Sequence, residues 1–458
     1  DDGVLAGEQI EAELFHLRAE IARVLMNLVA QRRGFLQQVD RAERRGADGG
    51  RERVGEQVRA RTLPQQVDDR LTRCGIAAGR AAERFAADKP ADFDDFVQAN
   101  EDWLIPYCEF MTVKEECGLK AFWEWPAELR TRGEASAKVC AAHPARMLYH
   151  QMTQYFFNRQ WSRLKAYANE RDILIIGDLP IYVAMDSADV WAEPEMFQLD
   201  EHNVPTEVSG VPPDCFSEDG QLWGNPLYNY EAMAKDGFGW WIRRIGGAQK
   251  LYDVIRIDHF RGFESYWAIP YGETTAKNGR WVKGPGMSLV GVLTGWFRDL
   301  DFIAEDLGYP SPEVVQLLSD SGLPGMKVLE FAFDSRDPSD YLPHSCNFNS
   351  ICYTGTHDNA PLALWRTEAD KADIAFAKKY LGLNDEEGFN AGIIRGGMSC
   401  QSRLFVAQMQ DYLGLGKGCR MNTPGTAGGN WVWRLLPGQA DAQTAARLLA
   451  RTQAACRA

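Results

Sequence analysis

The sequence predicts an α/β fold built on a mostly parallel sheet. Short apolar segments alternate with longer segments of helical periodicity after about residue 144, and strands that are separated by helices usually run parallel. Four of the apolar segments run directly into an acidic residue, namely Asp178, Asp258, Glu305 and Asp358. Charged side chains at the carboxyl ends of strands are typical of α/β barrels, which carry their chemistry on that rim.

Composition and charge narrow the possible classes of partner. The chain has 458 residues, 45% hydrophobic and 25% charged, which is ordinary for a globular protein that buries a large core. Its formal net charge of −14 argues against nucleic acid or an anionic membrane as a partner. The ten cysteines include no C-x-x-C pair, so we expect reduced thiols and not a disulfide framework or a zinc site. Because no apolar run has transmembrane length and no signal peptide is visible, a cytoplasmic protein is expected.

Residues 1–85 differ from the rest of the chain. They contain fifteen arginines but no lysine, tryptophan or tyrosine. Apolar residues at helical spacing predict a helix over residues 8–36, whereas residues 41–69 are polar and weakly patterned, which is typical of a loop or of disorder. We therefore expect an atypical, mostly helical or disordered N-terminal segment over 1–85 and a packed domain over 86–458.

The packed domain is expected to begin with helices and to continue with alternating strands and helices. Apolar residues recur at helical spacing over residues 93–111 and 144–169, and such stripes usually form core. The expected strands cover residues 173–177, 254–257, 302–304, 325–333 and 350–354. Further helices are expected at residues 230–252, 288–300, 312–319, 367–381, 400–413 and 440–457. The region 187–226 is irregular and rich in Gly, Pro and aromatic residues, which predicts long loops.

One strand carries charges where a buried strand should not. Val254, Ile255 and Ile257 are apolar and β-branched, as a covered parallel strand requires. Arg256 and Asp258 lie two residues apart, so both project from the same face. A buried charge is costly unless it is paired or used. The residues alone leave two interpretations open: a structural ion pair at a strand end, or part of a catalytic site.

The four strand-end acids would meet in one cleft if their strands belong to one parallel barrel. A single such acid is commonly a helix N-cap, but four of them, one beside an arginine and one after a histidine, favour a catalytic site. Several carboxylates together with many aromatic residues, in a chain without a Gly-rich phosphate loop or a metal-binding cluster, are typical of glycosidic-bond chemistry.

In such chemistry each acid would have a different task. Arg256 beside Asp258 would keep that carboxylate ionised as a nucleophile. Glu305, at the end of an apolar strand, is suited to a raised pKa and to an acid/base role. Asp358 could accept hydrogen bonds from ring hydroxyls as the oxocarbenium-like state forms.

Three further side chains are candidates for sugar binding. His357 could bind the same sugar as Asp358, although a core histidine satisfied by the backbone is the alternative. Trp223 and Phe331 could stack on pyranose faces, although ordinary packing would also account for them.

Several stretches of the chain resemble the 4-α-glucanotransferases, the amylomaltases or disproportionating enzymes of glycoside hydrolase family 77 in the α-amylase clan. The matching stretches run in the family's order from about residue 92 to 436: GDLPIYV (177–183), DSADVW (186–191), GVPPD (210–214), GQLWGNPLY (220–228), RIDHFRG (256–262), AEDLG (304–308), PGMKVL (324–329), GTHDN (355–359) and RMN (420–422). Together they are highly specific.

The resemblance implies a (β/α)8 TIM-type barrel with inserted subdomains over residues 86–458, including cleft loops at 187–230. By family role, Asp258 is similar to the nucleophile, Glu305 to the general acid/base and Asp358 to the transition-state stabiliser.

The resemblance also implies a set of substrate-binding residues. Arg256 and His357 match the sugar-site arginine and histidine of the clan. Asp214 and Trp223 fall in the loop that overhangs the cleft and contacts the glucan. Asn422 belongs to the last matching stretch and is a further candidate for substrate binding.

The N-terminal part departs from the family pattern. The family begins with a barrel strand that leads into a Ser-Leu-Pro-Gly type loop, followed by a second strand and an acceptor-side segment, and none of these occurs in residues 1–90. Those residues would have to supply the first two strands, but their pattern is helical. The sequence therefore predicts either a barrel that is incomplete at the N-terminus or an N-terminal segment foreign to the family.

The resemblance implies an enzyme that transfers an α-1,4-glucan segment to the 4-hydroxyl of another glucan by a retaining double displacement through a covalent glycosyl-enzyme intermediate. Its partners would be glucan donors and acceptors such as maltooligosaccharides and glucose, with no nucleic acid, membrane, metal or organic cofactor. Two alternatives stay open. One is an α-glucan hydrolase, in which water resolves the same intermediate, and the other is a catalytically impaired glucan-binding protein, which the missing strands favour.

Overall fold

The computed structural model describes residues 81–457 except 214–216, 309–310, 337–338 and 427. These residues form two compact units, one over residues 81–326 and one over residues 327–457. The helix expected at 8–36, the loop expected at 41–69 and nearly all of the segment 1–85 lie outside the described residues.

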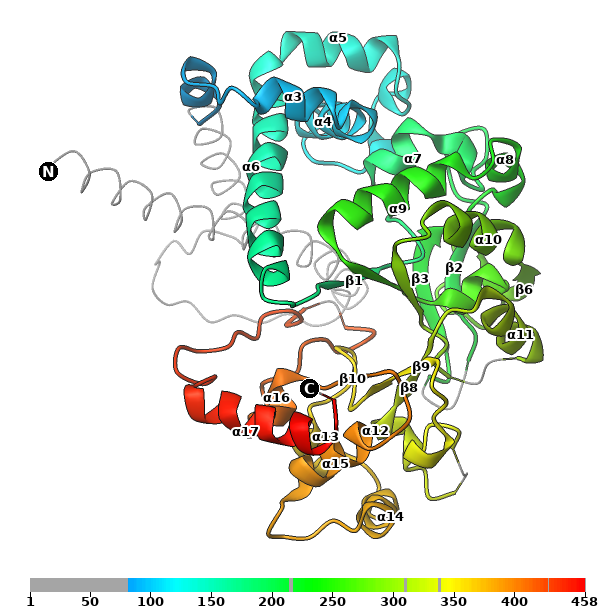
Figure 1. Ribbon diagram of the computed structural model, residues 1–458. Helices are drawn as coiled ribbons and strands as arrows, with labels where there is room; N and C mark the ends of the chain where they lie inside the picture. Colours follow the sequence, from blue (N-terminus) through cyan, green and yellow to red (C-terminus); the bar gives the residue numbers. More distant parts are fainter. Residues whose placement is uncertain (1–80, 214–216, 309–310, 337–338, 427, 458) are drawn as a thin grey trace, which may run out of the picture. The chain divides into compact units, whose positions relative to one another are not determined.

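The first unit begins with a layer of helices around α6. Residues 81–87 are helical, and their Phe85 packs against Phe93 and Tyr155. The helices of the layer are α3 (Phe93–Gln98), α4 (Glu101–Glu116), α5 (Glu134–Ala142) and α6 (Pro144–Asn169). Helix α6 starts with Pro144 in its first turn, where a missing N–H costs nothing, and the other three helices contact it (Figure 1). The helix expected at 144–169 is thus confirmed at both ends.

A three-stranded parallel sheet carries the first three strand-end acids. Its strands are β1 (Ile176–Leu179), β4 (Val254–Ile257) and β7 (Asp301–Ala304), in the order β1-β4-β7. In their register Asp178 pairs with Arg256, and Arg256 pairs with Ile303, so these three side chains project from one face of the sheet. The helices along this part of the chain are α7 (Ala188–Ala192), α8 (Tyr230–Lys235), α9 (Gly239–Leu251), α10 (Met287–Trp296) and α11 (Pro312–Ser321).

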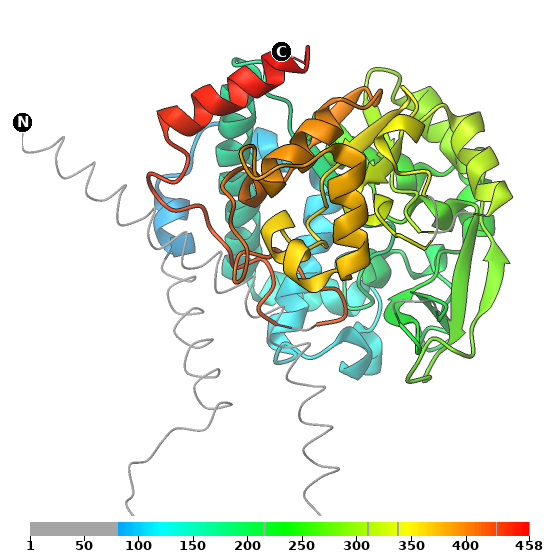
Figure 2. The same cartoon turned by 90° about the horizontal axis from the view of Figure 1, so that it is seen from below.

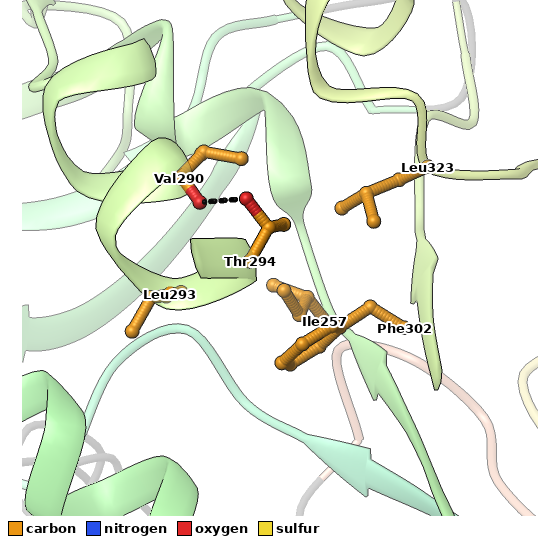
Figure 3. A pocket seen from close by; sticks show the side chains of 6 residues that line it. All are labelled: Ile257, Val290, Leu293, Thr294, Phe302 and Leu323. Atoms are coloured by element: carbon orange, nitrogen blue, oxygen red, sulfur yellow. Dashed lines mark hydrogen bonds between the residues drawn. The ribbon is translucent and has the colours of Figure 1, made fainter. Parts of the chain in front are cut away.

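The opposite face of this sheet is covered by apolar side chains. A small gap between the sheet and helix α10 is lined by Ile257, Val290, Leu293, Thr294, Phe302 and Leu323 (Figure 3). Thr294 is the polar member of this group, and its hydroxyl donates to the carbonyl oxygen of Val290 at 3.0 Å. Because side chains alternate along a strand, Arg256 is directed away from this apolar layer. The charged face and the core face of the sheet are therefore distinct.

The region 187–230, expected to form cleft loops, contains part of a second sheet. This sheet is antiparallel with the strand order β3-β2-β5-β6, and its strands are β2 (Glu207–Val211), β3 (Gln221–Pro226), β5 (Ser265–Pro270) and β6 (Arg280–Lys283). The sequence pattern did not indicate it, because the short strands are stabilised by long-range pairs such as Gly210 with Trp267 and not by a local apolar repeat. Strand β3 carries Trp223.

The second unit combines a small sheet with a group of helices. The sheet has the order β10-β9-β8 and consists of β8 (Gly325–Val328, at the division between the units), β9 (Ser350–Tyr353) and β10 (Leu404–Val406), with β9 and β10 parallel. The helices are α12 (Leu329–Ala332), α13 (Leu362–Glu368), α14 (Lys371–Leu381), α15 (Phe389–Met398), α16 (Met409–Tyr412) and α17 (Ala442–Ala454). Figure 2 shows the yellow and orange helices of this unit gathered together, and the buried side chains of α12, α13 and α15 belong to one apolar core.

The strand expected at 325–333 is wrong in its second half. The strand ends at Val328, and helix α12 follows at once. Leu329 and Ala332 are fully buried at helical spacing, so the apolar residues that extended the expected strand form the core face of a helix instead. Phe331 therefore lies on a helix.

The helix expected at 400–413 is also wrong, because it contains strand β10 and helix α16. Leu404 to Val406 pair with β9, and the N–H of Thr354 donates to the carbonyl oxygen of Val406 at 3.1 Å. Pairing with a neighbouring strand has overridden the helical spacing of this stretch. The helices expected at 230–252 and 367–381 each correspond to two shorter helices.

The buried strand expected at 173–177 starts later than its apolar run. Ile173 and Leu174 are 56% and 61% exposed, and the strand begins at Ile176. The carboxylate of Asp253 accepts the N–H of Ile175 at 2.8 Å. The N–H of Ile175 is therefore bonded to a side chain and not to a neighbouring strand. Among the described residues, β1 pairs with β4 alone.

The described residues thus have an α/β architecture. Within them, the five strands expected for one barrel lie in two three-stranded sheets, the second of which also contains β10. None of the described helices combines the length and the hydropathy that crossing a bilayer would require.

Candidate active site

Arg256 is the centre of the charged cluster on the parallel sheet, and it is only 7% exposed. Its Nη1 lies 2.5 Å from Oδ1 of Asp178 and 2.9 Å from Oδ1 of Asp258. Its Nε faces the sulfur of Met326 at 3.3 Å. The sheet register places all three charged side chains on one face, so the pair expected from the sequence is present and Asp178 is an additional partner.

The pairing with two carboxylates keeps Arg256 charged in a buried position. Burial works against the charge of Arg256, but the neighbouring carboxylates, Asp178 first among them, outweigh it and raise the pKa of the guanidinium. The side chains of Asp178 and Asp258 are 37% and 42% exposed. Asp258 therefore has a fixed positive charge on one side and solvent access on the other, as an attacking carboxylate requires.

The backbone holds Glu305 at the end of β7 against the end of β4. The N–H of Glu305 donates to the carbonyl oxygen of Ile257 at 3.0 Å, which continues the ladder between the two strands by one residue. The two carboxylate oxygens are held as well, because Oε2 accepts the N–H of His259 at 2.8 Å and Oε1 accepts the N–H of Leu307 at 2.9 Å. Adjacent parallel strands lie about 4.8 Å apart, so this register brings Glu305 beside Asp258.

The environment of Glu305 brings the pKa of its carboxyl group close to neutral pH. Burial raises the pKa of Glu305 to about 7, against the lowering effect of the positive Arg256 and with a further upward contribution from Asp258. The two backbone donors lower the pKa but do not cancel burial. A carboxyl group that gains and loses its proton close to neutral pH suits general acid/base catalysis.

Trp223, on strand β3 of the antiparallel sheet, contacts the ring of His259 beside Glu305. The two rings are 4.8 Å apart with their planes at 86°, and the indole N–H of Trp223 donates to Oε1 of Gln221 at 3.1 Å. His259 has a left-handed backbone with φ of 53°, a conformation that is uncommon for a residue other than glycine. Burial lowers the pKa of His259 to about 4, so this imidazole is neutral near pH 7. The strained turn at His259 is what presents its N–H to Glu305.

Asp358 lies in the second unit, in the loop that follows β9. Its Oδ1 accepts a hydrogen bond from Nδ2 of Asn422 at 2.5 Å, and its Oδ2 lies 3.5 Å from Nε2 of His357. The main-chain oxygen of Asp358 accepts from Nη2 of Arg420 at 2.6 Å. The structure thus brings together three residues that the sequence singled out, and Arg420 anchors the loop that carries them.

Hydrogen bonds among its own residues also hold the loop that follows β9. Oδ1 of Asn359 accepts both the N–H and the hydroxyl of Thr356 at 2.9 Å, and the N–H of Asp358 donates to the Thr356 hydroxyl at 3.2 Å. Nε2 of Gln408 donates to the carbonyl oxygen of Thr356 at 3.0 Å. The side chain of Asp358 is therefore carried by a backbone whose polar groups are already engaged.

Trp431 lies beside His357 in the second unit, and the sequence did not reveal it as a candidate. Its ring lies 5.0 Å from that of His357 and remains 46% exposed. Its backbone is left-handed, with φ of 60°, and its N–H donates to the carbonyl oxygen of Met421 at 2.6 Å. A bulky residue in this conformation is an outlier that persists only where surrounding contacts hold it, and such strain gathers at functional sites.

Two of the expected binding residues gain no support from these contacts. Asp214 lies outside the described residues. Phe331 is on helix α12 with its ring 6.5 Å from that of Tyr341 and is 37% exposed, so its role as a stacking platform stays a prediction.

The sequence did not assign a specific role to Asp178, His259 or Trp431. Of these, Asp178 could have been found, because it is one of the four acids that follow an apolar strand. His259 lies within the matching stretch 256–262 but had no further signal, and Trp431 had none, because a backbone conformation and a contact between distant segments leave no local pattern. Within the described part of the chain, no group of three or more His, Cys, Asp or Glu side chains is arranged to hold a metal ion.

Comparison with known proteins shows to which family this chain belongs. A family model described as 4-alpha-glucanotransferase matches residues 46–439. The 4-alpha-glucanotransferase of Streptococcus pneumoniae serotype 4 is 47% identical over 351 residues, which cover 76% of this chain and 70% of that protein. The 4-alpha-glucanotransferase of Thermus thermophilus is 44% identical over 380 residues, which cover 81% of this chain and 76% of that protein.

Comparison with solved structures points to the same family. The fold is similar to that of the amylomaltase from Streptococcus agalactiae in complex with acarbose, with a TM-score of 0.80 and 40% sequence identity, covering 83% of this chain and 78% of that chain. These matches confirm the resemblance seen in the sequence motifs. The chain belongs to the 4-alpha-glucanotransferase family.

Proposed function

We propose that this chain transfers α-1,4-glucan segments between maltooligosaccharides, or between starch- and glycogen-type glucans. The observation that carries the proposal is the pairing of a carboxylate held by a guanidinium with a carboxyl group whose pKa is about 7, at the ends of two adjacent strands. Retaining glycosidic chemistry needs one ionised and one protonated carboxyl group. Family membership favours a sugar hydroxyl over water as the group that completes the reaction.

In the first displacement, Asp258 attacks the anomeric carbon of the donor while Glu305 protonates the departing glycosidic oxygen. The shorter glucan leaves with that proton, and the transferred segment becomes an ester of Asp258. Arg256 orients the attacking carboxylate, since its Nη1 is bonded to Oδ1 of Asp258 at 2.9 Å. The other carboxylate oxygen, Oδ2, would form the new bond.

In the second displacement, Glu305 acts as a base. Its carboxylate takes the proton of the acceptor's 4-hydroxyl, the acceptor oxygen attacks the anomeric carbon, and the bond to Asp258 breaks. Two inversions give net retention, so the product has the α-1,4 linkage of the donor. The backbone bonds that hold both oxygens of Glu305 allow it to lose and regain a proton without moving.

Asp358 is proposed to stabilise the oxocarbenium-like state, with His357 and Asn422 beside it as sugar ligands. Support comes from the contacts of Asn422 and His357 with the two oxygens of Asp358 and from the family motif in which these residues occur. Trp223, Phe331 and Asp214 are proposed to contact the glucan, and the donors and acceptors are proposed to be maltooligosaccharides and glucose.

We also propose that the parallel strands belong to a (β/α)8 barrel. Consecutive strands β1, β4 and β7 are parallel and neighbours in order, as in such a barrel. The exposed side chains of Ile173, Leu174 and Ile176 at the edge strand are consistent with a further strand on that side.

Maltotriose as the only substrate tests the proposed reaction. Transfer is expected to give a ladder of longer maltooligosaccharides together with free glucose, and the number of reducing ends is expected to stay constant because each bond broken is replaced. Chromatography of the products and a reducing-end assay measure both. Products that only become shorter, with a rise in reducing ends, would show a hydrolase. Binding of acarbose without any change in maltotriose would show the impaired glucan-binding protein.

Replacing Trp431 by alanine is expected to weaken substrate binding more than it slows the chemical step. An aromatic face against a sugar ring contributes roughly 1–2 kcal/mol, so we expect the KM for maltotriose to rise about 5- to 30-fold with kcat changed far less. Steady-state kinetics at several maltotriose concentrations measure this. The matched control is Trp296→Ala, because Trp296 is 66% exposed on helix α10. Equal kinetics of the two variants would remove Trp431 from the binding site.

A further inference from the structure

Arg256 has a third partner besides the carboxylates of Asp178 and Asp258. Its Nε lies 3.3 Å from the sulfur of Met326, a residue of strand β8. Met326 is fully buried and Arg256 is only 7% exposed, so both groups are largely shielded from water. The Nε–H of the guanidinium therefore donates to a thioether, which is a weak and neutral acceptor.

A neutral acceptor suits this side of the guanidinium, because several negative charges already surround the group. Burial lowers the pKa of Arg256, but the carboxylates of Asp178, Asp258 and Glu305 each raise it. A further carboxylate at Nε would compete with Asp258 for the positive charge. An apolar side chain without an acceptor would leave an N–H of a charged group buried and unpaired, which is costly. The sulfur satisfies the N–H and avoids both effects.

The shape of the guanidinium connects the contact with sulfur to the contact with Asp258. The group is planar and rigid, so the direction of its Nε–H fixes the direction in which Nη1 points. Met326 at Nε and Asp178 at Nη1 hold it at two points, at 3.3 Å and 2.5 Å. Oδ1 of Asp258, at 2.9 Å from Nη1, therefore meets a donor whose position is already set.

The main chain of Met326 is fixed against the end of strand β7. Its N–H donates to Oδ1 of Asp306 at 2.7 Å, and the N–H of Ala304 donates to the carbonyl oxygen of Pro324 at 2.9 Å. Gly325 permits this approach, because a Cβ atom there would lie only 2.7 Å from Oδ2 of Asp306. All of these residues belong to the first unit. The sulfur is thus carried by a backbone that is held in place.

We propose that Met326 is a positioning residue for Asp258: its sulfur accepts the Nε–H of Arg256 and so turns Nη1 toward the attacking carboxylate. The catalytic consequence rests on the proposed function, because it matters only if Asp258 attacks the donor glucan. The hydrogen bond itself does not rest on that function and is measured separately.

Met326→Leu tests the catalytic consequence, because leucine nearly preserves the volume of the side chain and removes the acceptor. We expect kcat for maltotriose to fall about tenfold with little change in KM, since the loss arises when the carboxylate attacks and not when the glucan binds. Release of fluoride from α-maltosyl fluoride should fall by a similar factor. This donor forms the ester with Asp258 without needing a proton from Glu305, so a loss with both donors points to the nucleophile.

Met233→Leu is the matched control, because Met233 is a fully buried methionine in the apolar core of the same unit, on helix α8. It should lower the thermal stability about as much as Met326→Leu does and leave both rates unchanged. Equal kcat in Met326→Leu and the parent would overturn the positioning role, since leucine can replace a sulfur that only fills space.

Met326→Gln decides the role if Met326→Leu does not fold. Its side-chain oxygen is an acceptor at a similar distance from the backbone, so kcat should stay within about threefold of the parent's value. A loss of about tenfold or more in this variant would contradict the role, because the acceptor would then be present without its effect.

NMR spectroscopy measures the hydrogen bond in the absence of substrate. The Nε–H signal of Arg256 is identified as the arginine signal that disappears in Arg256→Lys. In Met326→Leu this proton should resonate at higher field and exchange faster with solvent, because its bond to sulfur is lost. An unchanged signal would overturn the proposal. The parent's products from maltotriose report on the proposed function alone, so the two can fail separately.

Discussion

Replacing Asp258 by asparagine is expected to abolish glucan transfer, with a fall in kcat/KM of about 10⁴-fold or more, because an amide cannot form the ester intermediate. The amide oxygen can still accept a hydrogen bond from Arg256, so the buried guanidinium keeps a partner and the fold is expected to survive. Product analysis from maltotriose and a thermal unfolding curve measure the two effects.

Asp178→Asn is the matched control, because Asp178 holds the same guanidinium at 2.5 Å. We expect it to lower the rate far less, since it leaves the attacking carboxylate in place. Azide offers a second check with the donor α-maltosyl fluoride. In Asp258→Asn, azide can attack the anomeric carbon in place of the missing carboxylate while fluoride leaves, and the product is the β-linked azide. Transfer that survives in Asp258→Asn would show that another residue is the nucleophile.

Replacing Glu305 by glutamine is expected to lower the rate with maltotriose by about 10²- to 10⁴-fold, the range that general acid/base catalysis contributes. The loss arises because the departing sugar oxygen receives no proton. With α-maltosyl fluoride the first displacement should persist, since fluoride leaves without a proton. The release of fluoride compared with the loss of maltotriose measures this separation, and Glu313→Gln on helix α11 serves as the control.

Glu305 should also determine the pH above which activity is lost. The pKa of Glu305 is raised to about 7, mainly by burial, and the acid form needed for the first displacement is present below that pH. We therefore expect kcat/KM for maltotriose to fall as the pH rises, with a midpoint near pH 7. In Glu305→Gln this decrease should be absent. A rate that stays flat up to pH 9 in the parent would contradict the assignment of Glu305 as the general acid.

Much of the candidate site could be predicted because its residues have local signatures. Asp258 and Glu305 each follow an apolar strand, and the alternation of side chains already places Arg256 on the same face as Asp258. The motifs around them then identified the family. Helix α6 was predicted from its apolar spacing for the same reason, since a helix of that length carries its own pattern.

The errors arose where long-range pairing competes with local pattern. The antiparallel sheet that carries Trp223 has short strands without an apolar repeat. Residues 404–406 became a strand because β9 offers a partner, and Leu329 began a helix because its neighbours on that face are buried. None of these choices is visible within a window of one segment.

By itself, the sequence indicated which side chains are candidates for chemistry, that most of the strands preceding them are parallel, and the family to which the chain belongs. Covalent order and apolar alternation suffice for these properties. Only the tertiary structure decided that Asp178 shares the guanidinium of Arg256, that burial brings the pKa of Glu305 to about 7 and that Trp431 lies against His357. These properties depend on the distance between segments far apart in the chain and on the removal of water, which exist only once the chain is packed.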